Sequence, residues 1–285
     1  MITQKTLKES IVLKGVGLHT GARVWVELSP AEPDSGIYFC SSGPEGRTTV
    51  KADPLNVVST DRSTVLGSDG MRVYTVEHLM AALYSEGITN CCVTVSAGEV
   101  PILDGSAAPF IEAIRGAGCL DQGVPARIAR VTAPALVESG SSVIAVAPSD
   151  GFSVTFVVAY PVTPVGVQIS EFTEGRDDFA RDIAPARTFG FLWEVEELTS
   201  RGLALGASLE CAVVADHSRY LTDLRFSDEV GRHKILDTVG DLYLLGIPRM
   251  RVVCFRSGHR LNNELCRKLL SEGLIEIVEA CGDDR

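Results

Sequence analysis

The sequence lacks any run of about 20 apolar residues, the length that a helix needs to span a bilayer. Its first ten residues include basic side chains, but no apolar segment follows them as it does in a secretory signal. Hydrophobic residues make up 45% of the chain and charged residues 22%, which is typical of a globular protein. We therefore expect a cytoplasmic protein without stable membrane insertion.

No two cysteines have the Cys-x-x-Cys spacing of many zinc sites and redox motifs, and the eight cysteines form no disulfide framework. A reducing cytoplasm also disfavours disulfides. We expect reduced and mostly packed thiols at all eight positions, which are Cys40, Cys91, Cys92, Cys119, Cys211, Cys254, Cys266 and Cys281.

Positive charge is also scarce. The chain has 26 lysines and arginines against 37 acidic residues, which gives a formal net charge of −11. Such a charge repels nucleic-acid phosphates over most of the surface. The expected partner is a small molecule, for which one local basic pocket is sufficient, and nucleic acid is not expected.

The order of patterned segments predicts two domains, since 285 residues exceed the usual size of one. Strands precede helices in each half, which favours an α+β fold: two domains of similar plan, each a mostly antiparallel sheet packed on helices. The glycine-rich segment 116–125 is the predicted linker. This places an N-terminal domain at residues 1–122 and a C-terminal domain at 126–285.

One predicted helix covers residues 76–84, with Thr75 as its N-cap and Gly87 at its end. Glu77 and His78 lie off its apolar stripe, in the first turn. Adjacent residues on a helix diverge by about 100°, so these two fit different roles, one as a metal ligand and one as a base. The alternative is a helix start that places charge in solvent.

A second predicted helix runs from an N-cap at Ser227 to Gly246. His233, Asp237 and Asp241 are spaced one turn apart on one face, and a histidine and a carboxylate at that spacing can bind one metal. Together with His78, the pair His233 and Asp237 would supply two imidazoles and a carboxylate, the three-ligand set of many catalytic zinc sites. The alternative is a solvated polar face.

His259 follows a glycine at the entrance to a third predicted helix, at about residues 262–272. A histidine there can donate a proton into a cleft, and Asp241 is placed in sequence to orient it and raise its pKa. A capping or core role is the alternative. His19 and His217 stay unassigned, with a structural or surface role expected.

Seven segments together resemble the zinc-dependent UDP-3-O-acyl-N-acetylglucosamine deacetylases of lipid A synthesis, nearly from end to end. Their order and spacing make the resemblance specific. They are Gly15–Gly21 (GVGLHTG), Thr75–Leu83 (TVEHLMAAL), Val100–Ser106 (VPILDGS), Ala186–Phe191 (ARTFGF), Gly202–Ser208 (GLALGAS), Arg232–Asp241 (RHKILDTVGD) and Ser257–Asn263 (SGHRLNN).

The resemblance implies a role for each matching residue. His78, His233 and Asp237 look like the zinc ligands, and Glu77 looks like the general base. His259 looks like the general acid with Asp241 behind it, and Thr188 like a residue that stabilises the oxyanion. Lys234 looks like a substrate-contacting cation and Phe189 like part of the pocket wall.

The resemblance also implies the wider architecture and the reaction. The two domains would stack as a β-α-α-β sandwich with a small insert in each, and the second insert, at about 191–215, would form a passage for the substrate acyl chain. The expected reaction is hydrolysis of the N-acetyl group of the UDP-sugar by a monomer. Two histidines and a carboxylate also suit ferrous iron.

Two other readings remain at this point. A sugar-nucleotide binding protein could keep the scaffold without turnover, and a zinc amidase could act on a different acylated sugar. Acetate release separates the first, and comparison of substrates with and without the 3-O-acyl chain separates the second.

Overall fold

The computed structural model describes residues 1–43, 46–68 and 70–280. Its first half contains a five-stranded sheet of order β2-β3-β9-β4-β5, in which only β4 and β9 are parallel neighbours. The strands are β2 (Ile11–Val16), β3 (Arg23–Pro30), β4 (Ile37–Gly43), β5 (Gly46–Lys51) and β9 (Cys91–Val95). The alternating pattern of β3 is that of a strand with one face on the core, because Val24, Val26 and Leu28 are all buried.

Two helices cover the inner face of that sheet, α1 (Glu77–Glu86) and α2 (Ala108–Ala117). A smaller sheet lies beside them, formed by β6 (Val57–Ser59), β7 (Val65–Ser68) and β8 (Met71–Val73), and the 3-10 helix η1 (Pro54–Asn56) leads into it. Gly87 ends α1 in the left-handed conformation, as predicted.

The second half is built around β18 (Ile247–Phe255), which pairs with three other strands. The remaining strands of this seven-stranded sheet are β11 (Arg127–Val131), β12 (Ala135–Ser139), β13 (Ser142–Pro148), β14 (Phe152–Tyr160), β15 (Gly166–Thr173) and β19 (Ile275–Glu279). Its helices are α5 (Glu229–Leu242), continued by η3 (Tyr243–Leu245), and α6 (His259–Ser271).

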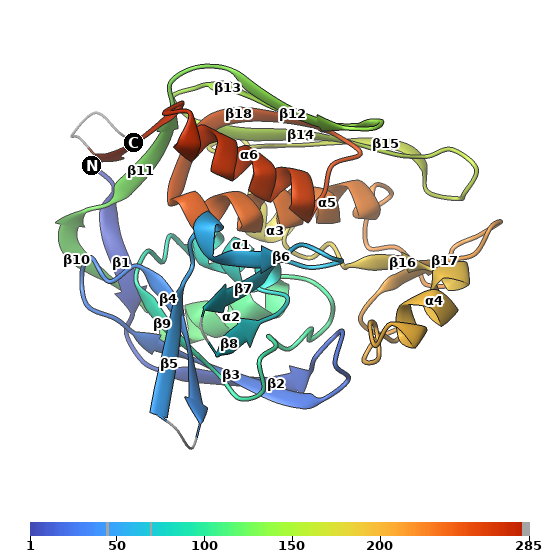
Figure 1. The fold of residues 1–285 in the computed structure, drawn as a ribbon, viewed down its shortest axis with the longest axis horizontal. Helices are drawn as coiled ribbons and strands as arrows, with labels where there is room; N and C mark the ends of the chain where they lie inside the picture. The colour runs from blue at the N-terminus through green and yellow to red at the C-terminus, as the bar shows by residue number, and fades with distance from the viewer. Residues whose placement is uncertain (44–45, 69, 281–285) are drawn as a thin grey trace.

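The layers stack as sheet, helices, helices, sheet, with α1 and α2 facing α5 and α6 (Figure 1). Tyr84 at the end of α1 packs edge-on against aromatic rings of the second half, including Phe152 and Tyr243 at 5.6 Å between ring centroids. The hydroxyl of Tyr243 donates to the carbonyl of Ile88 (3.0 Å). The expected α+β sandwich is confirmed.

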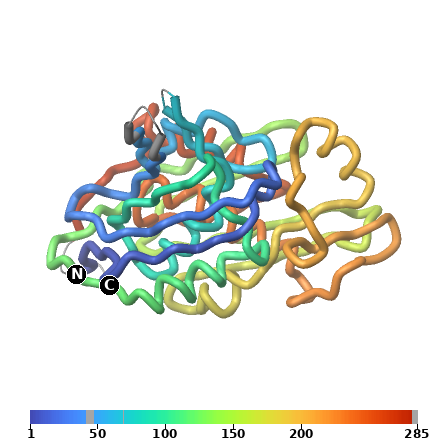
Figure 2. The backbone as a smooth tube through the Cα atoms, turned by 90° about the horizontal axis from the view of Figure 1, so that it is seen from below, coloured from blue at the N-terminus to red at the C-terminus, as the bar shows by residue number. Residues whose placement is uncertain are grey.

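The remaining elements are α3 (Phe179–Asp182) and a lobe at one end of the molecule, away from both termini (Figure 2). The lobe contains β16 (Phe189–Phe191), η2 (Leu192–Glu194), α4 (Val195–Ser200) and β17 (Val213–Ala215), and β16 pairs in parallel with β17. Among the described residues, no helix combines the length and the apolar character that crossing a bilayer requires.

Two local expectations were wrong. The N-cap position of α1 is Val76, and Thr75 instead has a positive φ of 59° and donates its hydroxyl to Glu99 (3.2 Å). The N-cap position of α5 is Asp228, not Ser227. In each case the helix begins one residue later than expected, so the residue after the predicted cap takes the N-cap position.

The predicted linker, segment 116–125, contains the end of α2 and the strand β10 (Cys119–Pro125), which pairs with β1 (Thr3–Leu7). The division into domains at 1–122 and 126–285 stays a prediction.

The seven described cysteines are thiols outside any disulfide, as expected, and all but Cys119 are buried. Burial raises the pKa of the thiols of Cys91 and Cys254 to about 12, which keeps them protonated and unreactive. Cys281 lies outside the described residues.

Candidate metal centre

The first turn of α1 points two ionisable side chains into the interior. Glu77 and His78 are each 3% exposed, because α1 is enclosed between the sheet of its own half and α5. A solvated helix start is therefore wrong for these two residues. Thr75, just before them, is tied to the buried carboxylate of Glu99, which also accepts from the backbone of His19 (2.8 Å).

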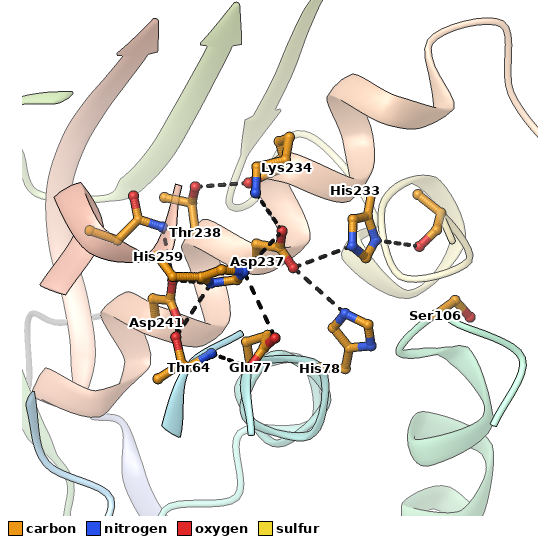
Figure 3. Close-up of polar contacts among 12 residues, drawn as sticks. Thr64, Glu77, His78, Ser106, His233, Lys234, Asp237, Thr238, Asp241 and His259 are labelled. Carbon is orange, nitrogen blue, oxygen red and sulfur yellow. Dashed lines mark hydrogen bonds and ion pairs between the residues drawn. The ribbon is translucent and has the colours of Figure 1, made fainter. Parts of the chain in front are cut away.

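The polar face of α5 meets this turn. His233, Asp237 and Asp241 are all buried, which rules out the solvated-face alternative. Asp237 Oδ1 lies 3.4 Å from His233 Nε2 and 3.6 Å from His78 Nε2. Donor atoms of these three residues lie within 4.8 Å of one another, and the side chains converge from α1 and α5 (Figure 3).

The hydrogen bonds around this cluster leave room for a cation. His233 Nδ1 lies 3.1 Å from the carbonyl oxygen of Ala186, so this nitrogen donates and Nε2 keeps its lone pair toward Asp237. Asp237 Oδ1 is buried and has no hydrogen-bond partner. An unpartnered carboxylate oxygen between two imidazoles is costly without a positive ion. The donor set therefore fits a divalent metal.

Charge effects agree with this interpretation. Burial lowers the pKa of His233 to about 4, although the Asp237 carboxylate opposes this shift, and the imidazole is therefore neutral, as a ligand must be. Burial opposes ionisation of Asp237, but the positive charges of Lys234 and His259 hold its pKa well below the usual value. Its side chain is therefore a carboxylate at neutral pH.

A second group, Glu77, Asp237 and His259, also has donor atoms within 4.8 Å. His259 Nδ1 lies 2.9 Å from Asp241 Oδ2, and its Nε2 faces Glu77 Oε1 at 3.8 Å. Burial alone would lower the pKa of His259, but the charges of Asp241, Glu77 and Asp237 outweigh it and raise the pKa to about 9. The expected pairing of His259 with Asp241 is present in the structure.

The sequence did not predict a role for Thr64, which bonds to the carboxylates of both Glu77 and Asp241. Its amide donates to Glu77 Oε2 (3.0 Å) and its hydroxyl to Asp241 Oδ1 (2.5 Å). It also missed Asn262, whose amide donates to Asp241 Oδ2 (2.9 Å). Asn262 lies within the segment 257–263 that was singled out, whereas nothing in the local pattern marks Thr64.

The three remaining predicted residues lie around the cluster. The ammonium of Lys234 donates to Asp237 Oδ2 (2.7 Å), and the ring of Phe189 lies edge-on to His233 with centroids 6.4 Å apart. Thr188 is held by its backbone, which donates to Gly105 (2.8 Å) and accepts from Val213 (2.7 Å). It follows Ala186, whose carbonyl orients His233, by two residues.

The segment 186–188 is fixed to the start of α5 by a buried ion pair. Arg187 Nε and Nη2 donate to the two oxygens of Glu229, at 2.9 and 3.2 Å. Glu229 also accepts from the amides of Arg187 (3.1 Å) and Arg225 (2.6 Å). This ion pair keeps the carbonyl of Ala186 beside the ring of His233.

The two unassigned histidines differ in environment. His19 is buried, and neither ring nitrogen has a hydrogen-bond partner. His217 is exposed and stacks on Trp193, with centroids 4.1 Å apart and planes within 6°. The surface role expected for His217 agrees with this exposure.

Comparison with known proteins gives one consistent result. Residues 4–271 match the family described as LpxC, UDP-3-O-acyl N-acetylglycosamine deacetylase. The chain is 46% identical over 275 residues to the UDP-3-O-acyl-N-acetylglucosamine deacetylase of Acidithiobacillus ferrooxidans, covering 95% of this chain and 90% of that protein.

The proteins of the same name from two further bacteria agree. That of Thioalkalivibrio sulfidiphilus is 44% identical over 277 residues, covering 95% of this chain and 91% of the relative. That of Syntrophotalea carbinolica is 41% identical over 287 residues, covering 98% and 93%. A match of this extent, on a chain whose buried histidines and carboxylates form a candidate metal centre, places the protein in the UDP-3-O-acyl-N-acetylglucosamine deacetylase family.

Proposed function

We propose that the chain hydrolyses the N-acetyl group of UDP-3-O-acyl-N-acetylglucosamine, giving acetate and the free amine, with one zinc ion held by His78, His233 and Asp237. Asp237 Oδ1 carries this assignment: it is buried, has no hydrogen-bond partner and lies between two imidazole nitrogens at 3.4 and 3.6 Å. Ferrous iron suits the same donors.

A divalent ion at this position supplies a Lewis acid for the amide carbonyl and lowers the pKa of water. Glu77 acts as the general base that accepts a proton from the attacking water. Burial raises the pKa of Glu77, which makes its carboxylate a stronger proton acceptor. The amide of Thr64 holds Glu77 Oε2 (3.0 Å), so the other oxygen is directed toward the site.

His259 acts as the general acid. With a pKa of about 9 it carries its proton at neutral pH, and Asp241 fixes Nδ1 so that the proton on Nε2 faces the site. The proton passes to the amide nitrogen as the C–N bond breaks. The sugar therefore leaves as the free amine, and the water oxygen ends in acetate. Of the two protons of the water, one restores His259 and the other is released to solvent.

Three further residues are assigned to the substrate. Thr188 contributes to stabilising the oxyanion that forms at the carbonyl, which agrees with its position next to the segment that orients His233. Lys234 supplies a positive charge to the substrate, and Phe189 forms part of the pocket wall. The lobe at about 191–215 receives the acyl chain.

The central test is acetate release from the acylated UDP-sugar by purified, metal-loaded protein. Replacing Glu77 with alanine should lower turnover by about 10² or more while the metal stays bound, the scale expected for loss of a general base. Metal content measured on the same samples separates loss of base from loss of metal. Retained full activity in Glu77→Ala contradicts the assignment.

Three further properties can be tested separately: the identity of the ion, the cellular location and the oligomeric state. Elemental analysis of protein purified without added metal distinguishes zinc from iron. The cytoplasmic location and the monomeric state expected from the sequence are tested by cell fractionation and by light scattering of the purified chain.

A further inference from the structure

Two ion pairs join the lobe to the first half of the chain. In one the first half supplies the cation, and in the other it supplies the anion. The turn between β6 and β7, which reaches toward α4 in Figure 1, supplies Asp61 and Arg62. Arg62 Nη1 and Nη2 donate to the two carboxylate oxygens of Glu194, each at 3.3 Å. Asp61 in turn pairs with Arg201. We call this pair of contacts the strap.

The strap joins the first half to a segment that otherwise packs within its own lobe, where Trp193 stacks on Phe191 and on His217. The far part of the lobe is fixed by backbone bonds, from Leu205 to His19 (3.2 Å) and from Gly206 to Leu18 (3.0 Å). For the near part, residues 192–201, the two ion pairs are the polar contacts to the first half among the described residues. The strap therefore supplies the polar contacts that hold this near part against the first half.

The near part carries exposed apolar side chains directly beside the strap. Leu192, Trp193 and Val195 flank Glu194 in sequence and are 52%, 41% and 44% exposed. Such a group next to a polar site is suited to contact an apolar ligand. An acyl chain placed there would be covered only if residues 192–201 stay against the body of the protein.

The same turn reaches the reacting groups. Two residues after Arg62, Thr64 donates to both Glu77 and Asp241. Arg62 itself has a positive φ of 63°, a conformation that a non-glycine residue adopts only when its surroundings hold it there. The position of the lobe is thus linked through three consecutive residues to the two catalytic carboxylates.

We propose that Asp61, Arg62, Glu194 and Arg201 are positioning residues that hold the lobe closed over the substrate acyl chain, and so set the preference for long-chain substrates. This rests on the proposed function, in which the lobe receives that chain. All four side chains are partly exposed, so each pair shifts the closed–open equilibrium by no more than about fivefold. The lobe can therefore open for entry and release.

The test reverses one pair and then restores it with the charges exchanged. Arg62 and Glu194 are suited to this, because Arg201 also faces Glu197 (3.7 Å). The variants are Arg62→Glu, Glu194→Arg and the double exchange. Arg176→Asp is the control. It changes the net charge by the same amount, but Arg176 pairs with its sequence neighbour Asp177 and does not contact the lobe.

Each variant is assayed on the long-chain substrate and on one with a 3-O-acetyl group. Each single reversal should lower kcat/KM for the long chain by about fivefold, mainly through KM, and by less than about twofold for the short chain. The double exchange should restore the long-chain value. Raising the salt concentration should lower the ratio of kcat/KM for the long chain to kcat/KM for the short chain in the wild type, but not in the single variants.

Hydrogen exchange of the metal-loaded full chain without substrate provides a readout that does not depend on activity. Amides of residues 192–201 should exchange faster in Arg62→Glu and return toward wild type in the double exchange. If the wild type releases no acetate, the proposed function fails, while exchange still reports on the strap. Unchanged exchange in Arg62→Glu, or no rescue by the exchange of charges, overturns the strap.

Discussion

Gly240 on α5 lies directly against the carbonyl oxygen of Glu77 on α1. A methyl group added at Gly240 would stand 2.0 Å from that oxygen, so the two helices pack backbone to backbone at this point. Because Gly240 lies between Asp237 and Asp241, this contact sets the distance between the α1 and α5 side chains of the metal centre.

Gly240→Ala should therefore move the two helices apart. We expect a loss of about 1–3 kcal/mol in the free energy of unfolding, the usual range for overpacking, together with weaker metal binding. Chemical denaturation and metal titration measure the two effects. Gly116→Ala in α2 is the matched control, because its added methyl group meets nothing within 4 Å and should leave stability equal or slightly higher.

The charge on Asp241 should control the alkaline limb of the pH profile. His259 must keep its proton to act as an acid, so activity falls as the pH rises through its pKa, which is about 9. Removing the negative charge in Asp241→Asn lowers that pKa and moves the limb to lower pH. The measurement is kcat/KM against pH, and an unshifted alkaline limb would count against His259 as the acid. Asp228→Asn, at the other end of α5, should leave the limb in place.

Loss of one imidazole should remove the metal. His78→Ala is expected to purify with little bound ion and no measurable turnover, whereas His217→Ala, on the exposed lobe, should keep its metal. In the wild type, free metal at 100 times its Kd should stabilise the fold by about 2.7 kcal/mol, and the His78→Ala variant should show much less of this gain. Elemental analysis and thermal unfolding with and without a chelator give both quantities.

The buried pair of Arg187 and Glu229 should contribute more to stability than any exposed pair. Glu229→Gln leaves the guanidinium of Arg187 buried without its counter-charge, which costs roughly 3–5 kcal/mol. The exposed pair of Arg260 and Glu264 is the control, where Glu264→Gln should cost less than about 0.5 kcal/mol. Equal losses in urea unfolding would contradict the distinction.

The sequence predicts well what depends on local spacing. The one-turn intervals on α5 are visible in the chain because helix geometry alone brings His233, Asp237 and Asp241 to one face. The alternating strands and the glycine end of α1 are local in the same sense. The roles of individual residues come from the resemblance to a family, because no pattern in one sequence distinguishes a ligand from a base.

Features that depend on distant contacts were not predictable. Thr75 has the residue type of an N-cap, but its hydroxyl bonds to Glu99, 24 residues away. Thr64 reaches Asp241 across 177 residues, and nothing beside it in the chain marks that contact. The segment 119–125 resembles a linker in composition, yet it pairs with the first strand of the chain and becomes β10.

The candidate ligands come from distant parts of the chain, His78 from α1 and both His233 and Asp237 from α5, which begins at Glu229. A ribosome that has synthesised only the first half has therefore made one candidate ligand and no site. Because domains tend to fold as they emerge, the ion can be captured only near the end of synthesis. Metal loading would then report that both halves have folded and docked, and a truncated chain would bind no ion at this centre.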